Sequence, residues 1–271
     1  MRVAAIQMVS AIAREANLAR AHSLLAEAAA EGAELAVLPE YFCMMGARDT
    51  DKLGLRETAG AGTVQSFLSD AAREFGLWVV GGTLPLETGD DDHVFNSSLA
   101  YSPEGRCVAR YDKIHLFYFD NGRERYDERR VIAPGSRPVC FDLPSRDGHR
   151  WRVGMSVCYD LRFPELYRVL AREGAELLLV PSAFTHTTGA AHWEVLLRAR
   201  AIENLAWVVA PAQGGRHENG RQTWGQTMVV DPWGAVVAQR AVDEAVVMVD
   251  IDAPRVERAR AQLPALSHRV L

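Results

Sequence analysis

The 271-residue sequence is poor in cysteine and has no excess of basic residues. Its 4 cysteines are Cys43, Cys107, Cys140 and Cys158, and none stands in a C-x-x-C pair. Cysteines scattered singly through a large chain argue against a disulfide framework and against a cysteine-based zinc site. The formal net charge of −5 provides no positive field for a phosphate backbone, so we expect no nucleic-acid partner.

Long apolar runs and targeting signals are also missing from the sequence. No segment approaches the ~20 apolar residues that span a bilayer, which argues against a membrane protein. Residues 1–7 lack the apolar stretch and the small-residue cleavage site of a signal peptide. We therefore expect a reduced, cytoplasmic protein that does not contact a membrane.

Sequence motifs for metals and nucleotides are missing as well. His115, His186 and His192 do not have the spacing of a ligand set, and no H-E-x-x-H motif or carboxylate cluster occurs. No G-x-G-x-x-G motif or P-loop follows a strand-like run. The sequence thus predicts a site that uses neither a metal ion nor a cofactor.

What the sequence does contain is an alternation of strand-like and helical patterns. Strand-like apolar runs cover residues 3–8, 35–38, 77–81, 98–101, 153–158, 177–181, 207–210, 227–230 and 246–251. Helical periodicity marks residues 15–31, 64–75, 164–173 and 192–204. Turns with Pro or Gly at residues 102–105, 146–148 and 231–234 predict hairpins, and therefore a mixed sheet. We expect one α/β domain over residues 1–271, with a short tail from about residue 263.

Two long stretches, residues 41–61 and 117–138, fit neither pattern. Glu40 directly precedes the first stretch, and Lys113 leads into the second. Long ordered loops in compact domains usually carry function. We therefore expect both stretches to form walls of a site.

Cys158 stands at the end of a strand-like run and shortly before Pro164, where a helix can begin. This strand–turn–helix arrangement places a thiol near helix amides, whose partial positive charge favours a thiolate and a developing oxyanion. The alternative is a buried structural thiol. Cys107 and Cys140 have no comparable setting, so we expect both to be inert.

Charged residues follow other strand-like runs. Glu40 stands just past residues 35–39, where open α/β sheets bind ligands, although a salt bridge at a strand end would also explain it. Lys113 follows the run 110–112, and taken alone it could be a solvated lysine. By the same standard Glu128 would be a surface charge.

These residues occur in sequence blocks with a defined order: Leu-Pro-Glu40, Asp-Lys113-Ile-His-Leu-Phe and Gly154-x-x-x-Cys158-Tyr-Asp-x-Arg-Phe-Pro-Glu165. In this order the blocks resemble the signatures of the nitrilase superfamily, and the resemblance extends over residues 2–263. The segments 191–204, 215–217 and 229–234 resemble the Nit amidase branch of that superfamily. The resemblance implies a four-layer α-β-β-α sandwich whose outer helices bury against a second copy, in a homodimer or a larger assembly.

The resemblance also implies catalytic roles. Cys158 would be the nucleophile that forms a thioester, and Glu40 would be the general base. Lys113 would stabilise the oxyanion together with the backbone N–H after the cysteine. A second family glutamate, which orients the lysine and the substrate amine, matches Glu128, with the acidic residues at 124 and 127 as alternatives.

The substrate implied by the resemblance is a small carboxamide, hydrolysed to a carboxylate and ammonia. True nitrilases have Cys-Trp-Glu at the nucleophile, whereas this chain has Cys158-Tyr-Asp160, which favours an amide over a nitrile. Gln213-Gly-Gly-Arg-His217 is more similar to the deaminated-glutathione amidases of the branch than to its omega-amidases, which favours an α-keto acid with an amide at its far end. The residues expected to bind substrate, with a threonine or an arginine on its carboxylate, are Tyr159, Ser182, Phe184, Thr185, Thr187 and His192.

Other functions stay open at this point. A carbamoyl amino-acid hydrolase would use the same cysteine, glutamate and lysine on a ureido group. A non-catalytic ligand-binding protein of the same fold is the other alternative. Such a protein would have no need of a thiol, a lysine and a carboxylate at separate strand ends.

Overall fold

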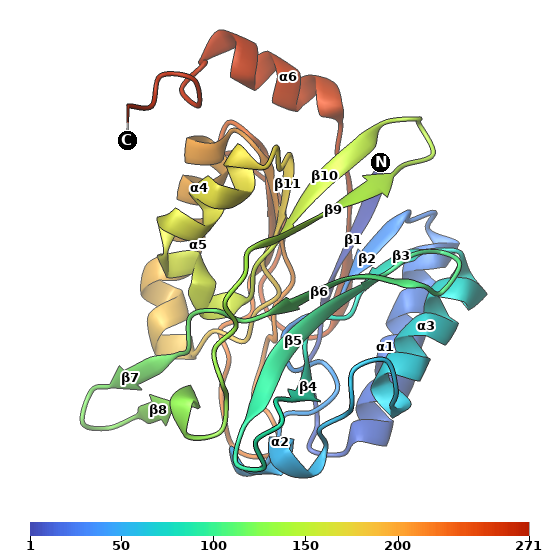
Figure 1. Ribbon diagram of the computed structural model, residues 1–271, viewed down its shortest axis with the longest axis vertical. Helices are drawn as coiled ribbons and strands as arrows, with labels where there is room; N and C mark the ends of the chain where they lie inside the picture. Colours follow the sequence, from blue (N-terminus) through green and yellow to red (C-terminus); the bar gives the residue numbers. More distant parts are fainter. Residues whose placement is uncertain (271) are drawn as a thin grey trace.

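The computed structural model describes residues 1–270, and two β-sheets packed face to face form its centre (Figure 1). Helices α1 (Arg14–Ala30) and α3 (Thr63–Phe75) cover the outer face of one sheet. Helices α4 (Pro164–Arg172) and α5 (His186–Asn204) cover the outer face of the other. The layers therefore follow the order α-β-β-α, which confirms the fold that the nitrilase resemblance implied.

Both sheets mix parallel and antiparallel pairs, as the hairpin turns predicted. The 7-stranded first sheet has the order β15-β1-β2-β3-β5-β4, with β6 paired to β5. Its strands are β1 (Arg2–Gln7), β2 (Leu35–Val37), β3 (Trp78–Val80), β4 (Leu84–Glu87), β5 (Val94–Tyr101), β6 (Cys107–Asp112) and β15 (Ala245–Asp250). The 6-stranded second sheet has the order β14-β13-β12-β11-β10-β9. Its strands are β9 (Val139–Pro144), β10 (Arg150–Met155), β11 (Leu177–Leu179), β12 (Trp207–Ala210), β13 (Thr227–Val230) and β14 (Val236–Arg240).

Strand β1 shows why the central strands are apolar throughout. Val3 and Ala5 belong to the core between the two sheets, whereas Ala4 and Ile6 belong to the core under α1 and α3. Successive side chains of a strand point to opposite faces, so a strand covered on both faces has no polar side. In a strand of this kind charged side chains are confined to the ends, as Arg2 is in β1.

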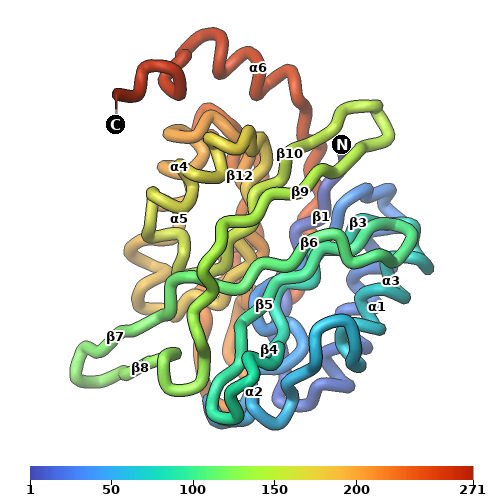
Figure 2. The backbone as a smooth tube through the Cα atoms, viewed as in Figure 1, coloured from blue at the N-terminus to red at the C-terminus, as the bar shows by residue number. Residues whose placement is uncertain are grey.

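The long irregular stretches contain short elements of their own. Helix α2 (Asp51–Gly54) lies in the first stretch. The second contains a hairpin of β7 (Tyr118–Asp120) and β8 (Arg125–Asp127), followed by the 3₁₀ turn η1 (Glu128–Arg130). The backbone leaves the first sheet after β6, runs through this hairpin and enters the second sheet at β9 (Figure 2). The hairpin is therefore the connection between the two sheets.

Some boundaries differ from the sequence-based predictions. Helix α5 begins at His186 rather than at residue 192, because the Thr185 side chain caps it by accepting from the Thr188 N–H. Strand β10 ends at Met155 rather than at residue 158, so Cys158 lies beyond the strand. Both differences change which side chains can face the loops at the sheet edge.

The C-terminal part contains a helix that the sequence pattern did not indicate. Helix α6 (Ala253–Gln262) is mostly polar, and so its periodicity is weak. The predicted tail follows it from Leu263, and Leu271 lies outside the described residues. No helix within residues 1–270 is long and apolar enough to cross a membrane.

Large apolar side chains are exposed on α5 and on the turn between β13 and β14. Val195, Ile202 and Trp233 are exposed by 69%, 46% and 57%. Ile202 lies beside the turn after Trp233, because a Cβ placed on Gly234 would come within 2.6 Å of its side chain. Exposed apolar side chains that lie together often mark a contact with another molecule.

We predict that the protein forms a homodimer or a larger assembly, and that the exposed face of α5 is part of the interface. Val195→Asp should lower the mass measured by light scattering, because it places a charge in an apolar interface. Val108→Asp is a matched control on β6, since Val108 is 42% exposed, and it should leave the mass unchanged. A monomeric mass for the unmodified chain at micromolar concentration would contradict the prediction.

Candidate active site

Glu40 follows β2 and is buried, with 1% of its surface exposed. Its Oε1 accepts from Asn96 Nδ2 and from Lys113 Nζ, both at 2.9 Å. Its Oε2 accepts from the backbone N–H of Ala183 at 2.9 Å. Because Ala183 follows β11 of the second sheet, the Glu40 carboxylate connects groups from both sheets.

The backbone beside Glu40 is tightly packed. A Cβ on Gly82 would lie 1.9 Å from the carbonyl oxygen of Pro39, so only glycine fits there. Tyr41 has a φ of 58°, which is unusual for a residue with a side chain. Its N–H donates to Thr83 Oγ1 at 2.9 Å and so holds this conformation. Backbone strain of this kind collects at functional sites.

Lys113 is the centre of a charged cluster and is only 1% exposed. Its Nζ lies 2.9 Å from Glu40 Oε1 and 2.9 Å from each carboxylate oxygen of Glu128. Burial alone would lower the pKa of Lys113, but the charges of Glu128 and Glu40 raise that pKa above its ordinary value. Lys113 is therefore a cation at neutral pH.

Glu128 stands at the start of η1 and is fixed by three groups. Its Oε1 accepts from the Tyr41 hydroxyl at 2.9 Å, and its Oε2 accepts from the Phe117 N–H at 2.7 Å, in addition to the bonds with Lys113. Burial alone would raise the pKa of Glu128, but the Lys113 ammonium lowers it, helped by the Phe117 N–H. Glu128 therefore stays ionised beside the lysine.

The two other acidic residues of this segment have different partners. Glu124 Oε2 accepts from Thr187 Oγ1 at 2.8 Å. Asp127 Oδ1 accepts from Arg129 Nε at 2.7 Å at the surface. Glu128 is thus the acidic residue of this segment that contacts Lys113.

Cys158 opens the 3₁₀ turn η2 (Cys158–Arg162), just after β10. Its φ of 50° is a left-handed conformation, and its N–H donates to the Pro181 carbonyl at 3.0 Å. Burial and the charge of Glu40 raise the pKa of the thiol well above its ordinary value, although Lys113 acts in the opposite direction. The thiol is protonated at rest, so its use as a nucleophile needs a base.

Asp160 holds the turn that carries Cys158. Its Oδ2 accepts from the Tyr111 hydroxyl at 2.7 Å and from the Val157 N–H at 2.9 Å. Its Oδ1 lies 3.0 Å from the N–H of His115 and 2.7 Å from the Nδ1 of that ring. Since Tyr111 belongs to β6 and Val157 follows β10 of the second sheet, Asp160 fixes the turn that carries Cys158 against the first sheet.

Asp160→Asn should destabilise the protein by about 2–4 kcal/mol, because the new NH₂ group would face donors where the carboxylate oxygen accepted. Urea unfolding measured by circular dichroism would show this as a lower midpoint. Asp142→Asn is the matched control, since Asp142 is 46% exposed and pairs with Arg152 at the surface. Equal midpoints for Asp160→Asn and the unmodified chain would show that the turn does not depend on this carboxylate.

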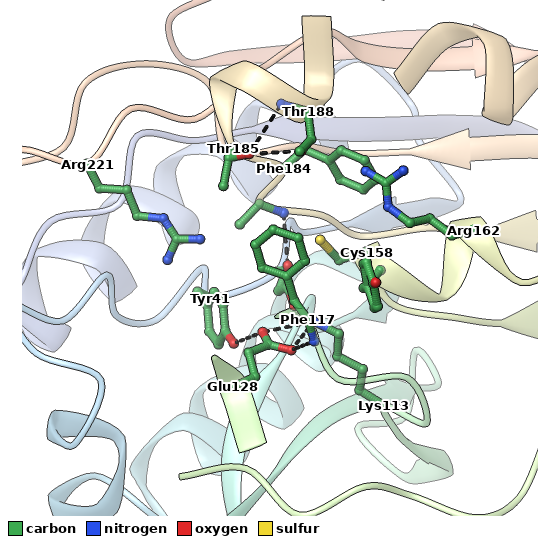
Figure 3. Close-up of a pocket in the computed structure, with 13 residues that line it drawn as sticks. Tyr41, Lys113, Phe117, Glu128, Cys158, Arg162, Phe184, Thr185, Thr188 and Arg221 are labelled. Carbon is green, nitrogen blue, oxygen red and sulfur yellow. Dashed lines mark hydrogen bonds and ion pairs between the residues drawn. The ribbon is translucent and has the colours of Figure 1, made fainter. Parts of the chain in front are cut away.

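Glu40, Lys113, Glu128 and Cys158 line one common pocket (Figure 3). The residues of the lining that the sequence had indicated are Glu40, Lys113, Glu128, Cys158, Tyr159, Phe184 and Thr185. Tyr41 and Phe117 belong to the two long stretches that were expected to form walls of a site. The residues of the lining that the sequence had not indicated are Arg162, Ala183, Thr188 and Arg221. Within residues 1–270, no three or more His, Cys, Asp or Glu side chains are grouped so that they could hold a metal ion.

The other residues expected to bind substrate lie outside this lining. The Ser182 hydroxyl is buried and donates to the Val180 carbonyl at 2.9 Å. Thr187 is exposed and bonds to the hairpin residue Glu124. His192 lies on the surface side of α5, with its Nδ1 3.2 Å from a nitrogen of Arg162. Thr187 and His192 are both exposed residues of α5.

Two arginines of the lining were missed for different reasons. Arg162 stands inside the sequence block around the nucleophile, four residues after Cys158, so that block could have revealed it. Arg221 stands in a polar loop between β12 and β13. Nothing in its sequence surroundings distinguishes it from a solvated arginine, and only the folded loop brings it to the pocket.

Both the sequence and the fold of this chain match those of known proteins. The model of the family described as carbon-nitrogen hydrolase matches residues 2–261. The chain belongs to this family. This carbon–nitrogen hydrolase is 40% identical over 270 residues to the deaminated glutathione amidase of Synechocystis sp., covering 98% of this chain and 97% of that protein. It is 36% identical over 270 residues to the omega-amidase NIT2 of Homo sapiens, covering 99% and 94%.

Solved structures give the same result. The NitFhit protein of C. elegans matches the carbon–nitrogen hydrolase with a TM-score of 0.88 and 37% identity, over 99% of this chain and 65% of that chain. Saccharomyces cerevisiae Nit3, of branch 10 of the nitrilase superfamily, matches with a TM-score of 0.87 and 29% identity, over 100% and 97%. A mutant amidase from Nesterenkonia sp. AN1 matches with a TM-score of 0.78 and 26% identity, over 97% and 98%. That structure shows acrylamide added to its active-site cysteine.

The predicted superfamily and Nit branch are therefore confirmed. The carbon–nitrogen hydrolase is an enzyme that acts on carbon–nitrogen bonds other than peptide bonds, and it is an amidase of the Nit branch.

Proposed function

We propose that this amidase converts the terminal amide of a small α-keto acid to a carboxylate and ammonia, through a thioester on Cys158. The observation that carries the proposal is the Lys113 ammonium, held 2.9 Å from Glu40 and from Glu128 in the pocket that contains Cys158. Relatives with the names deaminated glutathione amidase and omega-amidase support an amide as the substrate. The α-keto acid is the class that the sequence resemblance favours.

The first half of the reaction forms the thioester. Glu40 takes the proton of the Cys158 thiol, and the sulfur attacks the carbonyl carbon of the amide. The oxyanion that develops is stabilised by the Lys113 ammonium and by the backbone N–H of Tyr159. Glu40 then gives the proton to the amide nitrogen, the carbon–nitrogen bond breaks, and ammonia leaves.

The second half of the reaction hydrolyses the thioester. Glu40 takes a proton from water, and the resulting hydroxide attacks the thioester carbon. The carbon–sulfur bond breaks, the sulfur recovers a proton and the carboxylic acid leaves as its anion. Glu128 takes no proton in this scheme, because its bonds to Lys113, Tyr41 and Phe117 hold the ammonium in position.

Glu40→Gln should slow amide turnover by several orders of magnitude, because the amide side chain keeps the shape but cannot accept the thiol proton. With a reactive ester, whose leaving group needs little acid, this variant should accumulate an acyl adduct that intact-protein mass spectrometry detects. Cys158→Ala should form no adduct. Cys140→Ala should keep its activity, since burial raises the pKa of Cys140 to about 12 and its sulfur lies outside the pocket.

A Glu40→Gln variant that turned over the ester at the wild-type rate would show that another carboxylate is the base, and Glu128 is the one nearest to the lysine. An adduct that also formed on Cys158→Ala would place the nucleophile elsewhere. Both outcomes can be read from the same set of mass spectra.

The substrate class is tested by a screen of terminal amides of α-keto and dicarboxylic acids against ureido acids and nitriles, with ammonia and carbon dioxide measured in parallel. We expect the highest kcat/KM for an α-keto acid amide, with ammonia and no carbon dioxide. A ureido acid as best substrate, with both gases released, would identify a carbamoyl amino-acid hydrolase. Failure to turn over any of them would support a ligand-binding role.

A further inference from the structure

The pocket lining carries more positive than negative charge. Glu40 and Glu128 are its two carboxylates, whereas Lys113, Arg162 and Arg221 are its three cations. Both carboxylates are bonded to Lys113 at 2.9 Å. The lining therefore has a net charge of +1. Because Lys113 is paired with both carboxylates, the positive charge available to a ligand is on the arginines.

Arg162 is engaged by neighbouring side chains. One of its guanidinium nitrogens lies 3.2 Å from His192 Nδ1. Its guanidinium carbon lies 5.6 Å from the ring centroid of Tyr159 and 5.5 Å from that of Phe184. This arginine is packed between the nucleophile turn and the start of α5, and it completes the wall there.

Arg221 differs from Arg162 because one of its donors is buried without a partner. Its Nε is buried, and no group within residues 1–270 accepts a hydrogen bond from it. The guanidinium lies 5.1 Å from the ring centroid of Tyr126. Stacking on a ring uses the face of the guanidinium, whereas its N–H groups lie in the plane and still need acceptors. A buried donor of this kind is available to an acceptor that enters from outside the chain.

The backbone of the Arg221 loop is fixed before any ligand enters. The Arg221 N–H donates to Asn219 Oδ1 at 2.9 Å, and the Arg221 carbonyl accepts from the His217 N–H at 2.9 Å. Asn219 Nδ2 donates to the Gly46 carbonyl at 2.6 Å, and His217 Nδ1 lies 2.9 Å from the Ser10 carbonyl. The Arg221 loop is thus bonded to the loops that follow β1 and β2 of the first sheet. Its backbone therefore loses little conformational entropy when a ligand binds.

We infer that Arg221 binds a carboxylate of the substrate and so selects amides that carry a negative charge at the end away from the scissile bond. A guanidinium donates two parallel N–H bonds to a carboxylate, and the single excess positive charge of the pocket matches one such group. Figure 3 shows the Arg221 guanidinium directed into the pocket from the side opposite Arg162. The inference rests on the proposed function only for the identity of the bond that is cut.

Binding is tested without turnover in the Cys158→Ala background, with glutarate as the probe. Glutarate carries one carboxylate for the reacting end of the pocket and one for the far end. Adding Arg221→Met should weaken its Kd by about 10- to 100-fold in titration calorimetry, the range expected for a lost charge-assisted pair. Adding Arg216→Met instead should leave the Kd unchanged, because Arg216 lies exposed on the same loop and outside the pocket lining.

Turnover is tested with two amides of equal length, 4-carbamoylbutanoate and the neutral pentanamide. Arg221→Met should raise KM for the charged amide by about 10- to 100-fold and change kcat by less than about 3-fold. The kcat/KM for pentanamide should stay at the wild-type value. Arg221→Lys should recover part of the loss, because the charge returns without the planar pair of donors.

Each result separates this inference from the proposed function. Loss of glutarate binding in Arg221→Met, with no amide turned over by the wild type, would keep the carboxylate site and reject the amidase mechanism. Unchanged glutarate binding in Arg221→Met would overturn the inference, whatever the wild type hydrolyses. Equal losses of kcat/KM for 4-carbamoylbutanoate and pentanamide would also overturn it, because Arg221 would then be supporting the pocket and not reading the charge.

Discussion

A buried ammonium cannot stay charged in a protein interior unless carboxylates surround it, and Lys113 imposes this requirement on the whole site. Two carboxylates pair with the ammonium: Glu40 from the loop after β2, and Glu128 from the η1 turn after the hairpin that joins the sheets. The second oxygen of Glu40 reaches the Ala183 N–H of the other sheet. Pairing one cation therefore brings together both halves of the sandwich and the connection between them.

The same cluster sets the chemical state of the nucleophile. Burial and the negative charge of Glu40 raise the pKa of Cys158, and Lys113 offsets only part of this. A thiol in this state reacts slowly until its proton is removed, which ties the reactivity of Cys158 to Glu40. The left-handed backbone at Cys158 and the Asp160 network keep the sulfur at that position.

The fold and much of the pocket could be predicted from the sequence, because the responsible signals are local. Strands covered on both faces are apolar throughout, and Glu40, Lys113 and Cys158 stand in short blocks with a fixed order. Arg221 could not be predicted, because its place depends on how the loop between β12 and β13 folds back over the pocket. Thr187 and His192 were assigned to the substrate from the family resemblance, and the capped first turn of α5, which begins at His186, could not be read from periodicity.

The hydrogen-bond partners of Glu40 are far from it in the sequence, which matters while the chain is being synthesised. They lie at residues 96, 113 and 183, so the last of them is synthesised 143 positions after the glutamate itself. A ribosome adds about 5–20 residues per second, so for several seconds the nascent chain holds this glutamate without its partner from the second sheet. The Glu40 carboxylate thus acquires its full set of partners only when the two sheets close on each other.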